Sequence, residues 1–137
     1  MTLVVGVVAG GLSVSLLRGQ ADASVLDGIY TDSQAKQGDQ DYHKDCASCH
    51  AMDLGGRGQA PPLKGAEFVS NWNGLTVGVL FEKIQSAMPA DRPGQLSMEE
   101  NAGILAYMLQ VNKFPSGKNP LAADIDALKK IRFESPK

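Results

Sequence analysis

The first pattern along the chain is an uncharged apolar run over residues 1–17, which Arg18 ends. The run is shorter than the roughly 20 apolar residues that span a bilayer comfortably. An Ala-x-Ala sequence at residues 21–23 follows it. These features predict that residues 1–23 form a secretory signal, although no basic residue precedes the run. The alternative is that the segment is retained as a membrane anchor.

Beyond this run, apolar positions recur at three- and four-residue steps, which is the period of amphipathic helices. Residues 24–32 do not follow this period and are expected to form a flexible lead. From Ser33 the pattern predicts a helix that ends soon after His50, with Asp32 or Ser33 as its N-cap. Residues 51–65 are rich in Gly and Pro and predict a loop.

The second half of the chain contains three further helical patterns. A short helix is expected near residues 66–71. Thr76 then begins a clearer helix, which ends before Met88 because the residue before a proline disfavours helical geometry. A capping box at residues 97–100 begins the next helix, and a last amphipathic helix is expected near residues 122–131. The prediction is an all-α fold of three to four short helices joined by long loops.

The composition adds two constraints to this pattern. The chain has 137 residues, which suggests one domain, and its net charge is −2 with no basic stripe, which argues against a nucleic-acid partner. Short helices with Gly/Pro-rich loops also leave a core too thin to be stable alone. A bound group is therefore expected to fill the middle of the fold.

The motif Cys46-Ala-Ser-Cys49-His50 contains both cysteines of the chain. The spacing C-x-x-C-H is typical of c-type haem attachment. Two cysteines three residues apart on a helical turn can reach the two vinyl groups on one porphyrin edge and form thioethers. The histidine that follows lies under the iron and supplies a nitrogen ligand. The motif predicts one covalently bound haem c.

The motif has three other interpretations. A zinc site needs four ligands, but only His43 could complete the set, and the adjacent Cys49 and His50 give poor tetrahedral geometry. A redox disulfide between Cys46 and Cys49 would need a thioredoxin-like βαβ context, which the pattern lacks. The third interpretation is a fortuitous match.

A second axial ligand of the iron must come from distant sequence, because it binds the opposite face of the ring. The candidates are Met52, Met88, Met98, Met108 and His43. Met52 and His43 lie too near His50 to cross over, while Met98 and Met108 fall on helices. Met88 ends a helix and begins a Gly/Pro-rich loop, which favours it as the ligand. The alternative is that Met88 only fills a gap in the core.

These residues resemble those of class I monohaem c-type cytochromes over about residues 33–115. Gly38 and Tyr42 stand eight and four residues before Cys46, and residues 104–108 read Ile-Leu-Ala-Tyr-Met, similar to the family's LAYL pattern. The resemblance implies a cytochrome c-like fold around one haem. It also implies that the glycine and the aromatic allow the first helix to cross the last.

Two more positions take roles from this resemblance. Residues 61–65, Pro-Pro-Leu-Lys-Gly, resemble the family's GPxLxG loop. The carbonyl of Pro61, with Pro62 as the alternative, would then accept a hydrogen bond from the other nitrogen of His50 and fix the imidazole. Trp72 would donate to a haem propionate, and a buried core tryptophan is the alternative.

The resemblance extends more narrowly to one kind of cytochrome. Residues 76–109 are most similar to cytochrome subunits or domains associated with quinoprotein alcohol dehydrogenases. Residues 116–137 form a C-terminal extension beyond the cytochrome domain. Candidate side chains for burying the haem are Leu63, Phe68, Leu80, Ile84 and Ile104.

The expected function is one-electron transfer without catalysis, since His50 and Met88 would fill both axial positions. Partners would be redox proteins: a dehydrogenase as donor and an oxidase or another cytochrome as acceptor. The expected location is the periplasm, with membrane contact only if residues 1–23 are retained. The alternatives are a haem subunit of a dehydrogenase complex, or a ligand-binding or peroxidatic haem protein in which Met88 does not coordinate.

Overall fold

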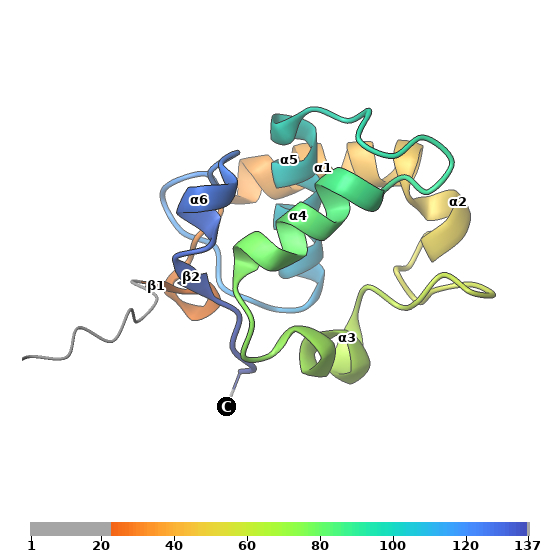
Figure 1. Cartoon of the computed structure of the whole chain (residues 1–137). Helices are drawn as coiled ribbons and strands as arrows, with labels where there is room; N and C mark the ends of the chain where they lie inside the picture. Colours follow the sequence, from red (N-terminus) through yellow and green to blue (C-terminus); the bar gives the residue numbers. More distant parts are fainter. Residues whose placement is uncertain (1–22, 137) are drawn as a thin grey trace, which may run out of the picture.

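The computed structural model describes residues 23–136. Figure 1 shows a mostly helical molecule in which α2 and the pair of short strands lie at opposite ends. The elements are β1 (Ala23–Ser24), a 3-10 turn η1 (Val25–Asp27), α1 (Asp32–Asp45), α2 (Ala47–His50), α3 (Gly65–Trp72), α4 (Val77–Ala87), α5 (Met98–Val111), α6 (Ile125–Leu128) and β2 (Ile131–Arg132). Four of these helices have eight residues or more, in agreement with the predicted helical pattern.

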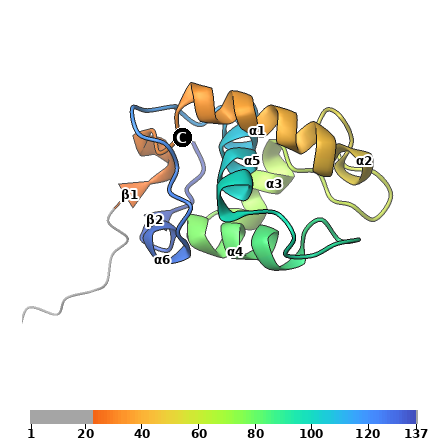
Figure 2. The ribbon, with the colours of Figure 1, turned by 90° about the horizontal axis from the view of Figure 1, so that it is seen from above.

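Helices α1 and α5 cross at a glycine, and Figure 2 shows α1 running across α5. A Cβ atom at Gly38 would lie 1.7 Å from the carbonyl oxygen of Gly103, so no larger residue fits without moving the helices apart. One turn later, the buried ring of Tyr42 packs on Tyr107 with ring centroids 5.5 Å apart. The crossing fixes the end of α1, from which the Cys46 turn continues.

The helix starts follow local side-chain chemistry. The Thr76 hydroxyl accepts from the backbone N–H of Val79 at the start of α4, and the predicted capping box of α5 is present, with Ser97 and Glu100 each accepting from the other's backbone. The cap of α1 differs from the expectation of Asp32 or Ser33. Thr31 is the N-cap, because its extended backbone lets its hydroxyl accept from the N–H of the residue three positions on.

Residues 24–32 are not a flexible lead in this structure, which corrects that expectation. Val25 and Tyr30 are almost fully buried, and the Tyr30 hydroxyl donates to the Phe114 carbonyl at 2.7 Å. Gly117 approaches the same segment so closely that a Cβ there would lie 1.9 Å from the Gly28 carbonyl oxygen. The segment is ordered by residues that follow it by more than 80 positions.

The C-terminal extension also packs against the cytochrome domain. Its helix α6 is shorter than the predicted 122–131, since the chain leaves the helix to pair β2 with β1 in parallel, Ala23 opposite Ile131. Gly78 allows this course, because a Cβ there would lie 2.5 Å from the Lys129 backbone nitrogen. Phe133 then enters the core, where its ring lies 5.2 Å from that of Phe114.

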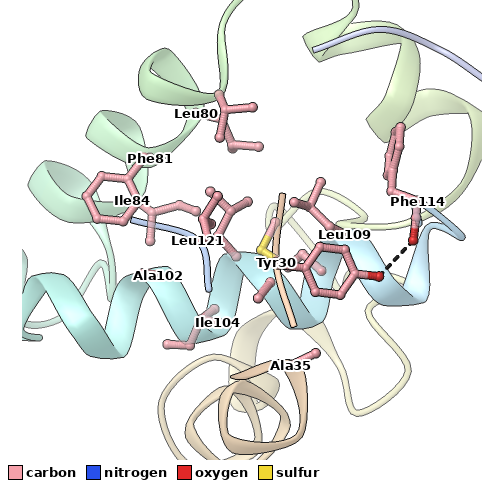
Figure 3. Close-up of a cluster of buried hydrophobic side chains, with 14 of the residues drawn as sticks. Tyr30, Ala35, Leu80, Phe81, Ile84, Ala102, Ile104, Leu109, Phe114 and Leu121 are labelled. Carbon is pink, nitrogen blue, oxygen red and sulfur yellow. Dashed lines mark hydrogen bonds between the residues drawn. The ribbon is translucent and has the colours of Figure 1, made fainter. Parts of the chain in front are cut away.

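One hydrophobic core joins α4, α5 and the two terminal segments. Figure 3 shows Phe81 and Ile84 of α4 facing side chains of α5, with the Tyr30 hydroxyl directed at Phe114. Within residues 23–136, none of the helices has the length and apolar character needed to cross a bilayer. Residues 1–22 of the predicted signal lie outside the described residues.

Candidate functional site

The motif residues lie on one turn that continues from α1. The N–H groups of Cys49 and His50 both donate to the Cys46 carbonyl, at 3.2 and 3.0 Å, so the two thiols and the imidazole belong to a single helical turn. Both cysteines are free thiols; Cys46 is half-buried and Cys49 is exposed. This is the arrangement in which two thioether bonds can form on one edge of a porphyrin.

The His50 side chain is 8% exposed and held in one orientation. Its Nδ1 lies 2.9 Å from the carbonyl oxygen of Pro61. A carbonyl can only accept, so Nδ1–H is the donor, and Nε2 carries the free lone pair. A hydrogen bond of this kind fixes the tautomer and the ring orientation of a metal-binding histidine. The structure thus joins the two residues that the resemblance paired.

The loop after His50 is held by backbone bonds and by one residue that the pattern did not indicate. The Leu63 N–H donates to the Leu54 carbonyl at 2.8 Å, and Leu54 is buried. The side-chain amide of Asn112 donates to the Leu63 carbonyl at 2.9 Å, and its oxygen accepts from the Gly65 N–H at 2.9 Å. Asn112 lies 49 positions from Leu63, so no local pattern identifies it.

Tyr42 supports the same loop from α1. Its hydroxyl donates to the Ala51 carbonyl at 2.7 Å, directly after His50. Burial is the main cause that raises the pKa of Tyr42, with nearby Cys46 a smaller one, so the phenol keeps its proton over the physiological range. The aromatic residue of the helix crossing therefore also supports the histidine.

Met88 is the C-cap residue of α4 and is half-buried against the core. The other candidate ligands lie elsewhere: Met108 is in the core at 2% exposed, and Met52 is 63% exposed beside the cysteine turn. His43 is exposed and its ring contacts Asp39 one turn back along α1. Met98, the first residue of α5, is half-buried like Met88. Met88 as the second ligand stays a prediction.

The loop that Met88 begins, residues 88–96, is closed at its base by a buried amide network. The Gln85 side chain donates to the Leu96 carbonyl at 3.2 Å. Its oxygen accepts from the side chain of Asn101 at 2.6 Å, and Asn101 is fully buried. The sequence did not predict Gln85 and Asn101 as part of the site. Polar residues within a helix are expected at the solvent-exposed face unless the packing shows that they are buried.

A second unpredicted contact ties the same loop to α1. Arg92 Nη2 donates to Asp45 Oδ1 at 2.6 Å. The Asp45 side chain is 2% exposed and that of Arg92 is 36% exposed. Asp45 immediately precedes Cys46, so this ion pair lies between the methionine loop and the cysteine turn.

The thiol chemistry bears on the alternatives for the motif. Burial, followed by the charge of Asp45, raises the pKa of the Cys46 thiol to about 11. A redox-active C-x-x-C pair needs a thiol with a lowered pKa, so this environment argues against that role. Within the described part of the chain, no group of three or more His, Cys, Asp or Glu side chains could hold a metal ion.

The apolar candidates for covering a haem come from α3, α4, α5 and the loop before α3. Phe68, Leu80 and Ile104 are buried, Ile84 is 9% exposed, and Leu63 is half-buried. Trp72, the last residue of α3, is half-buried with its ring 6.5 Å from that of Phe68. Free thiols on one turn, an oriented imidazole and a half-buried methionine match the donor set of haem c. The residues present therefore fit this group.

Residues 33–108, more than half of the chain, match the family model described as cytochrome C oxidase, cbb3-type, subunit III. The chain belongs to this family of c-type cytochromes. As a monohaem c-type cytochrome it takes haem c as its covalent cofactor, and its role is electron transfer. The predicted haem c cofactor is thereby confirmed, and the pair Cys46 and Cys49 fits the C-x-x-C-H attachment motif.

Among solved structures, this cytochrome is similar to a chain of the sulfane dehydrogenase SoxCD from Paracoccus pantotrophus. The TM-score is 0.50 at 19% sequence identity, over 93% of this chain and 68% of that chain. At such low sequence identity the match shows the fold alone, and it confirms the predicted cytochrome c-like fold. No curated protein matches the chain. The closer association with quinoprotein alcohol dehydrogenases stays a prediction.

Proposed function

We propose that this cytochrome is a one-electron carrier whose iron is held by His50 and Met88. When bound, haem c supplies an iron that takes up and releases one electron, and His/Met ligation raises its reduction potential. The observation that supports the proposal most directly is the His50–Pro61 hydrogen bond, because it leaves Nε2 as the metal-binding nitrogen. With both axial positions filled, no coordination position is left for a substrate.

The protein side chains have three roles in this proposal. Cys46 and Cys49 anchor the ring through thioethers, and His50 and Met88 set the coordination. The half-buried and buried apolar candidates of α3, α4, α5 and the loop before α3 would exclude water, which favours the less charged ferrous centre. The exposed Cys49 places its thioether next to solvent, where a partner can approach.

We further propose that the protein works in the periplasm after removal of residues 1–23, and contacts the membrane only if that segment is retained. Its electron donor would be a dehydrogenase and its acceptor an oxidase or another cytochrome. The similarity of fold to a chain of a sulfane dehydrogenase supports a place within or beside such a complex. Intact mass of the exported protein measures both haem attachment and cleavage, and co-purification with a large dehydrogenase would identify a subunit.

The ligand assignment is tested by Met88→Ala. The variant should keep its covalent haem, bind carbon monoxide rapidly when reduced, and have a lower reduction potential than the wild type, because the thioether ligand is lost. The exposed Met52 provides the matched control, and Met52→Ala should leave all three properties unchanged. An unchanged potential in Met88→Ala would contradict the assignment.

A further inference from the structure

The Asp45–Arg92 ion pair joins two segments that the sequence keeps 47 residues apart. Asp45 is the last residue of α1 and is followed directly by Cys46. Arg92 lies in the middle of the loop 88–96, four positions after Met88. Each member therefore has one of the proposed haem-binding residues as a close neighbour in sequence, and the pair connects the two sides of the site.

Because Asp45 is buried, breaking its ion pair with Arg92 would be energetically unfavourable. A buried carboxylate is unfavourable unless it is paired or hydrogen-bonded. Asp45 Oδ1 accepts the short bond from Arg92, and the other cation near this carboxylate, Lys44 Nζ, lies 3.7 Å from Oδ2. Moving the loop away would leave the carboxylate buried without its strongest partner. The loop is thus biased toward the position in which Arg92 reaches α1.

Besides the backbone bond from the Arg92 N–H to the Pro89 carbonyl, two side-chain contacts act on the base of the loop. The Gln85 bonds to Leu96 and Asn101 close the loop between α4 and α5. The bond from Arg92 crosses to the opposite side, to the end of α1 that leads into the cysteine turn. The base and the middle of the loop are therefore held by separate contacts, and the middle contact can be removed while the base stays intact.

We propose that Asp45 and Arg92 are positioning residues, whose ion pair holds the methionine loop against the cysteine turn and so keeps the Met88 sulfur on the iron. This inference rests on the proposed function, in which His50 and Met88 are the axial ligands. Neither residue is a ligand itself. Loosening the pair would let the methionine leave the ferric iron, since a thioether is a weaker ligand than the imidazole on the other face.

A direct charge effect on the iron would give a different result, which makes the proposal testable. If the two charges acted on the iron only through space, loss of the Asp45 charge would raise the reduction potential and loss of the Arg92 charge would lower it. If the pair positions Met88, either loss lowers the potential, because both weaken the ligand that raises it. The direction in which Asp45→Asn shifts the reduction potential therefore distinguishes the two cases.

The experiment compares holoprotein variants Asp45→Asn, Arg92→Gln and Arg92→Lys with the wild type. The control is Lys129→Gln, which removes a 3.6 Å ion pair with Glu82 between side chains 45% and 53% exposed. The measurements are reduction potential, the charge-transfer band of methionine-ligated ferric haem, and imidazole binding to the ferric protein. Asp45→Asn and Arg92→Gln should lower the potential, weaken the band and tighten imidazole binding about tenfold, as expected for loss of one charged hydrogen bond.

Arg92→Lys should recover most of the wild-type behaviour, and Lys129→Gln should show no change. Potentials that shift in opposite directions with the band intact would overturn the proposal in favour of a direct charge effect. An unchanged band and imidazole affinity in Arg92→Gln would overturn it as well. Arg92 is partly exposed in a loop, so this variant tests the proposal even if Asp45→Asn does not fold. A wild type without the charge-transfer band would instead contradict the ligand assignment itself.

Discussion

The His50 side and the Met88 side of the site are built differently. His50 bonds directly to nearby backbone: its turn closes on the Cys46 carbonyl, and its ring bonds to the Pro61 carbonyl eleven residues on. The side chains of Tyr42 and Asn112 support only the loop that follows it. Met88 begins a loop held by side chains, one of which is paired with a residue 47 positions away. Backbone contacts of short range depend little on residue identity, whereas long-range side-chain contacts can each be lost by one substitution. The proposed methionine ligand should therefore be the weaker of the two proposed ligands.

The largest expected effect is on the histidine side. His50→Ala should give no stable holoprotein, because the turn loses the ligand that its backbone is arranged to present. Visible absorbance and intact mass of the exported protein measure this outcome. His43→Ala, at an exposed position on the preceding helix, is the control and should mature normally. A stable red His50→Ala protein would show that the two sides do not differ as described.

The helix crossing provides the next largest effect. Gly38→Ala places a Cβ 1.7 Å from the Gly103 carbonyl oxygen, and the overpacking should destabilise the holoprotein by about 3 kcal/mol. The same substitution at the facing glycine, Gly103→Ala, is the matched control. A Cβ at Gly103 would make ordinary contacts at 3.5 Å or more, so Gly103→Ala should cost less than about 1 kcal/mol. Denaturant unfolding of both variants measures the difference, and equal losses would contradict this description of the crossing.

A smaller effect is expected at Tyr42, which supports the backbone after His50. Tyr42→Phe removes the hydroxyl that donates to the Ala51 carbonyl and should cost about 1 kcal/mol. Tyr30→Phe is the comparison, because it removes an equally short bond, to Phe114, away from the site. Both variants should lose similar stability. Hydrogen exchange at residues 50–52 should quicken in Tyr42→Phe alone, and equal exchange in the two would indicate that Tyr42 has no special role.

The smallest effect concerns the start of α5, where the methionine loop ends. The Ser97 N–H donates to the Glu100 carboxylate at 2.8 Å, and this bond lowers the pKa of Glu100 below its ordinary 4.5. Its contribution to stability is therefore present above pH 4.5 and is lost as the pH falls through the lower folded pKa. Glu100→Gln should be slightly less stable than the wild type at pH 7, and the difference should vanish in acid.

The free energies of unfolding of wild type and Glu100→Gln, measured at pH 7 and in acid, test this pH dependence. Glu99→Gln is the control, since Glu99 lies in the same first turn of α5 but outside the capping box. A difference that grows as the pH falls would contradict the assignment of the capping bond.

The parts of the fold that sequence predicts well are those set by neighbours in the chain. The C-x-x-C-H spacing, the caps at Thr76 and Ser97, and the end of α4 at Met88 each depend on a few adjacent residues. The His50–Pro61 bond spans eleven positions and was indicated by resemblance to a family loop. Local chemistry and family pattern together therefore defined most of the proposed site.

The parts that sequence did not predict depend on distant partners. Asp45 and Arg92 each look like an ordinary surface charge until the fold buries the carboxylate. The segments 24–32 and 122–131 were predicted from short local patterns, which could not show that Tyr30 and Phe133 enter a common core. Their true structure follows from packing across more than 80 positions, and α6 is short because β2 must pair with β1.

The parallel pairing of Ala23 with Ile131 brings the two ends of the described chain to one edge of the molecule. In both ribbon views this edge lies opposite α2 (Figures 1 and 2). A linkage made at this edge, to an electrode or to a partner protein, would thus leave uncovered the exposed Cys49 turn at which we propose that electrons are exchanged.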